Sequence, residues 1–273
     1  MDPAADEICA AVLGLIMDLQ LVNKVVLISG SSRGIGKAIA QALLQAGCRV
    51  CITGRTPATL QAAGAELKQA HGERVLSIMG DFTEPATMQS ALETVHRVWG
   101  KLDILVANLG GGRGQTGWQV GVQEWLRVFQ LNFFSAVNLT ELALPYLQKN
   151  GGNILFIASI VALESLPAPL PYSAAKAALA NYSKNLSRQV AASGIRVNCL
   201  APGNIYFPGG SWEHHLENRK AEVSAYIAAE VAQQRFGMPE EIANFAAFLL
   251  SPLCAFATGG YFVLDGGQSR RIG

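Results

Sequence analysis

Ser29-Gly30-Ser31-Ser32-Arg33-Gly34-Ile35-Gly36 is the stretch that decides the fold, because it follows a short apolar run and opens a segment of helical character. Glycine permits a tight turn and a close approach of a ligand to the backbone, and free N–H groups at the start of a helix attract a pyrophosphate. Three glycines alone are a weak signal, but the spacing G-x-x-x-G-x-G between a strand and a helix favours a nucleotide site. We therefore expect a cofactor loop made of Gly30, Ser32, Arg33, Gly34, Ile35 and Gly36.

Short apolar runs alternate with longer helical segments along the chain. Most runs are continuously apolar, as expected where helices cover both faces of a parallel sheet. The alternation predicts an α/β fold, a doubly wound, seven-stranded parallel sheet in a single domain over 17–273. Region 203–238, rich in glycine, aromatic and charged residues, is expected to be an irregular lid, and 1–16 an N-terminal extension outside the core. Strands are expected at 25–29, 49–53, 74–80, 104–107, 153–159, 195–200 and 261–264, and helices at about 34–46, 57–70, 84–99, 122–148, 171–193 and 239–250.

Composition excludes several classes of protein. The chain has 273 residues, of which 50% are hydrophobic and 15% are charged, so it can bury a large core and is not expected to be disordered. A net charge of +1 offers no electrostatic footprint for nucleic acid or for an anionic membrane. No apolar run approaches the ~20 residues that span a bilayer. We therefore expect neither nucleic acid nor a membrane among its partners.

The five cysteines are odd in number and scattered. Cys48 and Cys51 have a C-x-x-C spacing, but they fall in a predicted buried strand, where their side chains would point to opposite faces. We interpret the cysteines as reduced packing residues of a cytoplasmic protein, without a redox or zinc role. The N-terminus carries acidic residues and no base before Lys24, so neither a secretory signal nor a mitochondrial transit peptide is expected.

The end of the second predicted strand refines the nucleotide prediction. A site that prefers NAD usually has an acid there, which holds the ribose hydroxyls, whereas this chain has Thr53-Gly54-Arg55. Arg33 in the glycine loop supplies a second guanidinium, and two guanidiniums near one ribose suit a 2′-phosphate, which arginine binds in bidentate fashion. We therefore favour NADP(H) over NAD(H) as the cofactor. The alternative is that Arg55 is merely a solvated residue at the entry of a helix.

Tyr172-Ser173-Ala174-Ala175-Lys176 places a phenol and an ammonium one helical turn apart, so both can approach one site. A free tyrosine has a pKa of about 10 and is a poor proton shuttle at neutral pH, and a neighbouring ammonium is expected to lower that pKa. The spacing Y-x-x-x-K alone is common by chance. Ser159, at the end of the fifth predicted strand, strengthens the pattern, because ligands bind at the carboxyl ends of parallel strands.

Taken together, the motifs resemble those of the short-chain dehydrogenase/reductase family, in the single-domain branch that includes 3-oxoacyl-acyl-carrier-protein reductases. The resemblance covers about residues 19–268 and implies a Rossmann-type sheet. Each motif alone is weak, whereas their joint occurrence at the family's spacing is very specific. The motifs are Ser29-Gly30, Gly34-Ile35-Gly36, Asp81, Ala107-Asn108-Leu109-Gly110, Asn132, Ser159, Tyr172 with Lys176, Pro202-Gly203 and Leu264-Asp265-Gly266-Gly267.

The resemblance implies catalytic roles for four residues. Tyr172 would be the general acid in carbonyl reduction and the general base in alcohol oxidation. Lys176 would hold the nicotinamide ribose and lower the pKa of the tyrosine. Ser159 would donate a hydrogen bond to the substrate oxygen as charge develops on it. Asn132, in the long predicted helix 122–148, would hold a water that links Lys176 to solvent.

The resemblance also implies cofactor contacts outside the glycine loop. Asp81 would hydrogen-bond the adenine amino group, and Asn108 would brace the central strands beside the cofactor. The hydride itself belongs to the nicotinamide, so the protein supplies positioning and proton transfer. The remaining implied contacts are Arg55, Phe82, Gly110, Tyr172, Lys176, Pro202, Gly203 and Ile205.

Two departures from the family pattern concern the active site. The usual Asn-Asn-Ala-Gly is replaced by residues 107–110, and Gly111, Gly112 and Gly114 follow. This glycine-rich loop is expected to border the site and to leave room for a bulky or polar substrate. Phe207 stands where a threonine commonly binds the nicotinamide carboxamide, so that contact is expected from backbone groups near Ile205, or to be weaker.

The lid region offers further candidates. Trp212 is the residue there that we expect to contact substrate. The adjacent His214 and His215 would point to different faces of any helix, so no metal site is expected. The proline-rich run 167–171, just before Tyr172, is expected to stiffen the opposite wall.

The sequence therefore predicts an NADP(H)-dependent oxidoreductase that interconverts a carbonyl and a secondary alcohol. An NAD-linked sugar or polyol dehydrogenase is the alternative, and a non-catalytic nucleotide sensor is disfavoured because both Tyr172 and Lys176 are present. The small-molecule substrate stays open among 3-oxoacyl thioesters, sugars or polyols, and cyclic ketones. The resemblance also implies a homotetramer or homodimer, which the long apolar faces of 122–148 and 171–193 fit, as they would fit a buried core.

Overall fold

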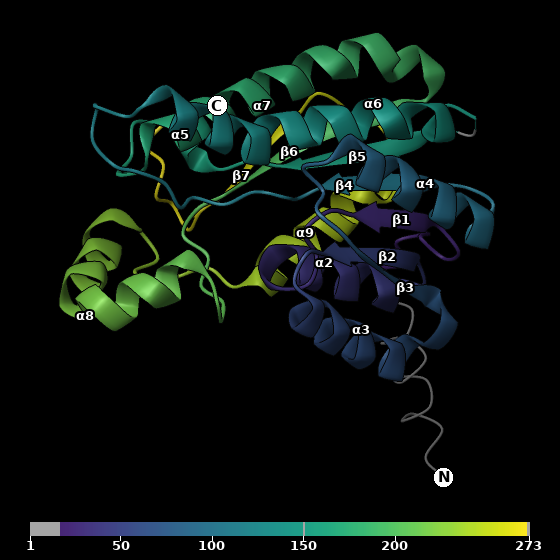
Figure 1. Ribbon diagram of the computed structural model, residues 1–273, viewed down its shortest axis with the longest axis horizontal. Helices are drawn as coiled ribbons and strands as arrows, with labels where there is room; N and C mark the ends of the chain where they lie inside the picture. Colours follow the sequence, from purple (N-terminus) through teal and green to yellow (C-terminus); the bar gives the residue numbers. More distant parts are fainter. Residues whose placement is uncertain (1–16, 150, 272–273) are drawn as a thin grey trace, which may run out of the picture.

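The computed structural model describes residues 17–149 and 151–271, so the predicted extension at 1–16 lies outside the described residues. A seven-stranded sheet, with parallel pairing throughout, crosses the centre of the molecule in the order β3-β2-β1-β4-β5-β6-β7 (Figure 1). The doubly wound sheet predicted from the sequence is confirmed, with strand ends within two residues of expectation. The strands are β1 (Val25–Ile28), β2 (Arg49–Gly54), β3 (Val75–Met79), β4 (Ile104–Ala107), β5 (Gly152–Ile157), β6 (Ile195–Pro202) and β7 (Tyr261–Leu264).

Helices cover both faces of the sheet and divide the core in two. On one face lie α2 (Gly34–Gln45), α3 (Pro57–His71) and α9 (Pro239–Leu250), and on the other α4 (Pro85–Trp99), α6 (Ser135–Leu147) and α7 (Leu170–Val190) (Figure 1). Side chains of a strand alternate between the two faces. In β1, therefore, Val26 and Ile28 pack on the first face, and Val25 and Leu27 on the second.

The predicted C-x-x-C pair follows the same alternation. Cys48 packs on the first face and Cys51 on the second, and both are buried as free thiols. The prediction that their side chains point to opposite faces is confirmed.

The order of the strands reverses beside β1, and this reversal locates the candidate site. The chain runs from β1 outward to β2 and β3, then returns to add β4 on the other side of β1. Loops that leave β1 and β4 therefore diverge at the carboxyl edge of the sheet and leave a crevice where ligands bind in such folds. Residues 29–33 and 108–112 form these two loops.

The long helix predicted at 122–148 is interrupted. It comprises α5 (Val122–Phe129), a π-helical turn η2 (Gln130–Phe134) and α6. A π turn inserts an extra residue into the helical repeat, and such turns occur frequently at functional sites. Asn132 lies in the middle of η2, where the altered backbone directs it into the structure.

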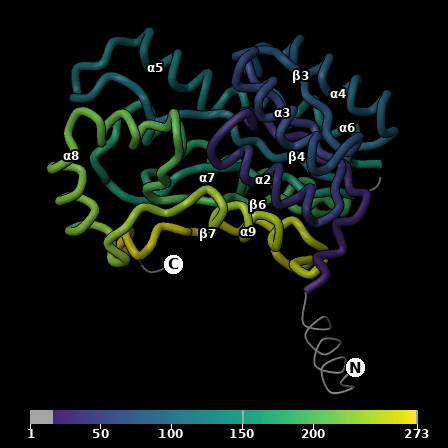
Figure 2. Tube along the Cα trace, turned by 90° about the horizontal axis from the view of Figure 1, so that it is seen from below, coloured from purple at the N-terminus to yellow at the C-terminus, as the bar shows by residue number. Residues whose placement is uncertain are grey.

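The lid region 203–238 is not irregular, as the sequence suggested, but carries a helix, α8 (Ser211–Glu230). The apolar residues of α8 do not form one continuous stripe, because the helix is kinked at Arg219, with φ −144° and ψ 45°. Figures 1 and 2 both place α8 beside the body of the molecule, at the same end as α5. Within residues 17–149 and 151–271, no helix is both long enough and apolar enough to cross a membrane.

Candidate active site

The glycine loop between β1 and α2 has the backbone that the sequence predicts for a nucleotide site. Gly30 and Gly34 have φ of +63° and +55°, a conformation that L side chains rarely adopt. Helix α2 begins at Gly34, so its N-terminus lies at the carboxyl edge of the sheet, beside the crevice. The ring of Phe207, from the lid, lies against Gly34, since a side-chain carbon there would lie 2.7 Å from it.

Hydroxyl groups fasten this loop to the end of β2. The Ser31 hydroxyl donates to the Ile28 carbonyl at 2.7 Å and accepts from the Thr53 amide at 2.8 Å. The Thr53 hydroxyl accepts from the Gly30 amide at 3.0 Å and donates to the same Ile28 carbonyl at 3.1 Å. Each buried hydroxyl is satisfied in both directions, so the loop is held without a ligand.

Asn108, at the end of β4, braces the two central strands as expected. Its Nδ2 donates to the carbonyls of Ser29 and Gly30 at 3.1 and 2.8 Å. The Ser29 hydroxyl in turn accepts from the backbone amides of Asn108 and Leu109. A side-chain carbon on Gly36 would lie 2.5 Å from Nδ2 of Asn108, so glycine is required at position 36.

The residues predicted for the adenosine end occupy the far side of the glycine loop. Arg55 is exposed just after β2, while Arg33 donates to the Gly209 carbonyl of the lid at 2.7 Å. Asp81 accepts from the backbone amide and the hydroxyl of Thr83 at 2.9 and 2.8 Å. The hydrogen bond from the Thr83 backbone amide is the main cause that lowers the pKa of Asp81, and the positive charge of Arg55 lowers it further. Asp81 is therefore ionised at neutral pH.

Three of the predicted cofactor residues have no side chain available for a cofactor. The side chains of Phe82 and Ile205 are buried in the core. Gly203, after Pro202, packs on Asp265 and donates its amide to the Leu264 carbonyl at 2.9 Å. Any contact from these three positions to a cofactor would use backbone atoms.

The structure brings the predicted catalytic residues together at the start of α7. Tyr172 lies in the first turn of α7 and Lys176 one turn later, with its Nζ 5.9 Å from the centre of the tyrosine ring. Lys176 is buried, and its Nζ donates to the Ile157 carbonyl at the end of β5, at 2.8 Å. Ser159 lies two residues beyond β5 rather than inside it, and it begins a short 3-10 turn at 160–162.

Sequence reasoning missed Tyr261, which supports this group from β7. Its hydroxyl donates to the Ser159 carbonyl at 2.7 Å and so fixes the backbone that carries the serine. Burial raises the pKa of Tyr261, which keeps this donor protonated. The only sequence signal was its place in the last strand, beside β6.

The electrostatics of Tyr172 differ from expectation. Burial raises the pKa of its phenol above the ordinary value, and a hydrogen bond with the Ser159 side chain acts in the opposite direction. Lys176 was expected to lower that pKa, but its ammonium is directed to the Ile157 carbonyl, and desolvation is the larger influence. Burial also lowers the pKa of Lys176 to about 8. In this structure Tyr172 is therefore a protonated phenol at neutral pH.

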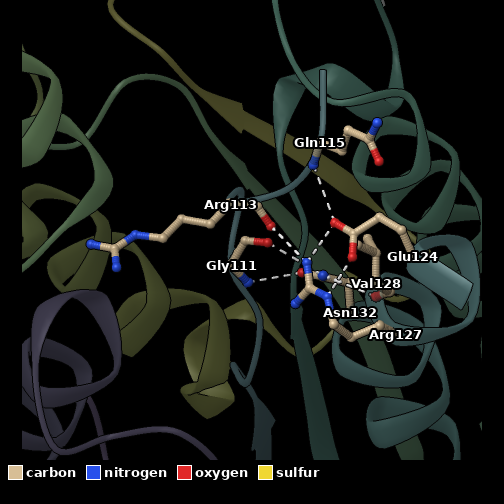
Figure 3. Close-up of polar contacts among 7 residues, drawn as sticks. All are labelled: Gly111, Arg113, Gln115, Glu124, Arg127, Val128 and Asn132. Carbon is tan, nitrogen blue, oxygen red and sulfur yellow. Dashed lines mark hydrogen bonds and ion pairs between the residues drawn. The ribbon is translucent and has the colours of Figure 1, made fainter. Parts of the chain in front are cut away.

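Asn132 joins the catalytic group to the loop after β4 (Figure 3). Its Nδ2 donates to the carbonyls of Val128 and Gly111, and its Oδ1 accepts from the Gly111 amide at 2.9 Å. A side-chain carbon on Gly110 would lie 2.8 Å from Asn132 Oδ1 and 3.1 Å from Lys176 Nζ. The two polar groups therefore flank the same glycine.

An ion pair on α5 holds the rest of this loop (Figure 3). Arg127 donates from Nε and from one terminal nitrogen to the carboxylate of Glu124, at 2.6 and 2.7 Å. The same carboxylate accepts from the Gln115 amide, and the same guanidinium reaches the Arg113 carbonyl at 3.4 Å. The sequence contains Glu124 and Arg127 at a helical i,i+3 spacing, but nothing in it indicates that they bind this loop.

Trp212 lies in an aromatic cluster inside the lid. Its ring stacks on Tyr226 at 5.9 Å with an interplanar angle of 17°, and it packs on Phe236 at 5.3 Å. Tyr226 accepts a hydrogen bond from Gln268 near the C-terminus. Trp212 thus has a structural place in the lid, and its contact with substrate stays a prediction. The part of the chain that the structure describes contains no group of three His, Cys, Asp or Glu residues placed to hold a metal ion.

Known proteins resemble this chain in sequence and in fold. A family model described as Enoyl-(Acyl carrier protein) reductase matches residues 30–269. The chain belongs to the short-chain dehydrogenase/reductase family. It is 35% identical to the 3-oxoacyl-acyl-carrier-protein reductase of Escherichia coli, over 90% of this chain and 97% of that protein. It is 31% identical to the L-fucose dehydrogenase of Bos taurus, over 95% of this chain and 94% of that protein.

Solved structures of family members have the same fold. An L-sorbose reductase from Gluconobacter frateurii, complexed with NADPH and L-sorbose, matches with a TM-score of 0.87 and 33% identity, over 94% of this chain and 100% of that one. A 7α-hydroxysteroid dehydrogenase complexed with NADH matches with a TM-score of 0.85 and 29% identity, over 94% of this chain and 98% of that one. The protein is therefore an oxidoreductase that acts on the alcohol–carbonyl pair with a nicotinamide cofactor.

Two neighbouring glycines test how closely Asn132 and Lys176 flank position 110. A methyl group on Gly110 collides with Asn132 Oδ1, which three hydrogen bonds hold in place, whereas nothing lies within 4 Å of the same group on Gly111. Small displacements of catalytic groups are costly. We expect Gly110→Ala to lower kcat by about 10-fold or more, and Gly111→Ala to change it little. Steady-state kinetics on both variants check this, and equal effects of the two would contradict it.

The pH dependence of stability tests the burial of Lys176. The pKa falls from 10.5 to about 8 on folding, so between these values the unfolded chain binds a proton that the folded chain has lost. The free energy of unfolding should therefore rise with pH in this window. Between pH 7.5 and pH 9.5, the free energy of unfolding of the unmodified protein without cofactor should rise by about 2 kcal/mol more than that of Lys176→Met. Urea denaturation at the two pH values measures this difference. Identical pH profiles for the two proteins would show that the ammonium is not desolvated.

Proposed function

We propose that this protein reduces a ketone to a secondary alcohol with NADPH, and catalyses the reverse reaction with NADP. The observation that carries the proposal is the meeting of Ser159, Tyr172, Lys176 and Asn132 beside the glycine loop, at the point where the strand order reverses. Similarity to the Escherichia coli 3-oxoacyl-acyl-carrier-protein reductase and to an NADPH-bound L-sorbose reductase supports this reaction class.

The proton chemistry is assigned to Tyr172 and Ser159. A buried, protonated phenol is suited to give its proton to a carbonyl oxygen as negative charge develops there. The Ser159 hydroxyl, which is close enough to the phenol to lower its pKa, can donate to the same oxygen and stabilise it. Tyr261 keeps Ser159 in position through the Ser159 carbonyl. In alcohol oxidation the phenolate would take the proton back.

Lys176 and Asn132 complete the proton path in this proposal. The Lys176 ammonium donates to the Ile157 carbonyl and lies 5.9 Å from the centre of the Tyr172 ring, so its charge would stabilise the phenolate that forms after proton transfer. Both donor hydrogens of Asn132 are used within the protein, and one lone pair of its Oδ1 is left for a water that links Lys176 to solvent.

The loops at the carboxyl edge of the sheet fit a nicotinamide dinucleotide. Left-handed glycines at 30 and 34 leave the start of α2 free of side chains, so its N–H groups can hold the pyrophosphate. When bound, the nicotinamide would supply or accept the hydride. The Phe207 ring, which lies against Gly34, has to move aside with the lid loop as the cofactor enters. Residues 203–238 are accordingly proposed to act as a lid on the single catalytic domain.

The preference for NADP(H) is supported by Arg55, which is exposed and lies close enough to Asp81 to lower its pKa. Arg33 would have to release the Gly209 carbonyl before it reached the same phosphate. Similarity to the bovine L-fucose dehydrogenase supports the alternative, an NAD-linked sugar or polyol dehydrogenase. Direct comparison of the two cofactors separates these possibilities.

A homotetramer or homodimer in the cytoplasm is also proposed. Exposed apolar side chains on α5 and η2 suit an interface between copies, namely Val122, Leu126 and Phe134, which are 67, 55 and 41% exposed. The free thiols of the described cysteines suit a reducing compartment.

Removing the Tyr172 hydroxyl tests the catalytic assignment. We expect Tyr172→Phe to lower kcat for ketone reduction by about 10²–10⁴-fold, because the general acid is lost while the ring still packs. Tyr182→Phe, on the same helix but packed against Phe156 and away from Ser159, should retain turnover. Nicotinamide absorbance over a ketone and alcohol panel is the readout. Full activity of Tyr172→Phe on every ketone that the parent reduces would refute the assignment.

Removing the Arg55 guanidinium tests the cofactor preference. We expect Arg55→Ala to weaken NADPH binding by about 10-fold or more, since a charge-assisted bond to the 2′-phosphate is lost. NADH binding should change little, as should NADPH binding in Arg49→Ala, at the opposite end of β2. Fluorescence titration measures the dissociation constants. Tighter binding of NADH than of NADPH by the parent would overturn the preference.

A further inference from the structure

The loop after β4 presents one arginine from a fixed backbone. Bonds to the Gly111 amide, the Arg113 carbonyl and the Gln115 amide hold the loop on both sides of Arg113 (Figure 3). The Arg113 side chain takes no part in these bonds. It is exposed, and Figure 3 shows that it extends away from the Glu124–Arg127 pair.

The residue before this arginine, Gly112, packs against the ring of Tyr172. A side-chain carbon on Gly112 would lie 3.6 Å from Cε1 and 3.7 Å from Cζ of Tyr172, so Gly112 covers the hydroxyl end of the ring. Consecutive Cα atoms are about 3.8 Å apart, which places the base of Arg113 at the edge of this contact. The Arg113 charge also acts on His215 of α8. Its guanidinium is therefore within electrostatic range of the lid region, and Figure 3 shows it extending away from α5.

The charge of Arg113 has no ion-pair partner in the part of the chain that the structure describes. Glu124, the acid that binds this loop, is neutralised by Arg127 in a bidentate pair. Within residues 17–149 and 151–271, no carboxylate forms an ion pair with Arg113. Burial lowers the pKa of His215, with Arg219, His214 and Arg113 adding to the effect, so the imidazole that Arg113 faces is neutral at pH 7.

We propose that Arg113 binds an anionic group of the substrate, a carboxylate or a phosphate, at the end remote from the reacting carbonyl. The substrate is then an anionic ketone and the product the corresponding hydroxy acid or hydroxy phosphate. Arginine recognises both anions in bidentate fashion, and its fixed backbone defines how far the anion lies from Tyr172. The proposal rests on the proposed ketone reduction and adds the substrate class to it.

Matched substrates test the inference. We would compare 4-oxopentanoate and 5-oxohexanoate with their methyl esters, and dihydroxyacetone phosphate with dihydroxyacetone, in the parent, in Arg113→Gln and in Arg97→Gln. Arg97 is an exposed arginine on α4, remote from the site. For the preferred anion, kcat/KM should exceed that of its neutral partner by about 10-fold or more. Arg113→Gln should abolish this preference without changing the neutral ketones, and Arg97→Gln should keep it.

The outcomes separate the inference from the reaction. If the parent reduces the neutral ketones as well as the anions, the inference fails and the proposed reduction stands. If no ketone is reduced, the reduction fails, and calorimetric titration of the NADPH-saturated protein with the same anions still decides the inference. The inference is overturned if the anions bind neither the parent nor Arg113→Gln, or if they bind both proteins equally. Weaker NADPH binding by Arg113→Gln would overturn it too, because the arginine would then serve the cofactor. A preference confined to the carboxylates or to the phosphate identifies the anion.

Discussion

One side-chain amide joins the carboxyl ends of β1 and β4, and the geometry of the site depends on it. Asn108 donates to the carbonyls of Ser29 and Gly30, and the Ser29 hydroxyl accepts from the loop that Asn108 begins. Because four hydrogen bonds from Asn108 and Leu109 end on Ser29 and Gly30, the predicted cofactor loop and the loop after β4 are held in one fixed relation. The amide also occupies the space that any side chain at position 36 would need, so α2 can start there only with glycine.

The π turn extends this fixed relation to the catalytic group. It directs Asn132 inward, where its side-chain amide forms hydrogen bonds with the backbone of Gly111. The oxygen of this amide and Nζ of Lys176 both lie beside Gly110. Lys176 in turn binds the Ile157 carbonyl, from the strand that leads to Ser159. Sheet, loop and helix α7 thus meet at buried hydrogen bonds. Buried polar groups that are fully bonded favour one arrangement, and this suits a site where displacement by 1 Å is costly.

The helical part of the lid region is attached far more loosely than its first residues, of which Ile205 is buried in the core beside the sheet. Its apolar cluster, which includes Val223, Ile227 and Trp212, is separate from the two clusters beside the sheet. Its bonds to the body include those between Arg33 and Gly209 and between Gln268 and Tyr226. Segments with few buried contacts open more easily than the core. Since Phe207 of the lid lies against Gly34, opening of the lid and access to the cofactor loop are the same event in the proposed function.

The sequence by itself determined the order of strands and helices along the chain, the two central loops and the candidates for the catalytic group. These follow from local patterns, namely apolar runs, glycine spacing and a helical i,i+4 pair, which are set by residues close together in the chain. It did not reveal that Ser159 lies beyond its strand, that 122–148 breaks at a π turn, or that α8 is a helix. Only the tertiary structure decided where Tyr261, Glu124 and Arg127 act and which way Arg113 points, because each of these depends on packing between segments distant in the chain. The shift of the Tyr172 pKa belongs to the same class, since its largest cause is burial, a property of the folded chain, and not the neighbouring charge that spacing alone suggests.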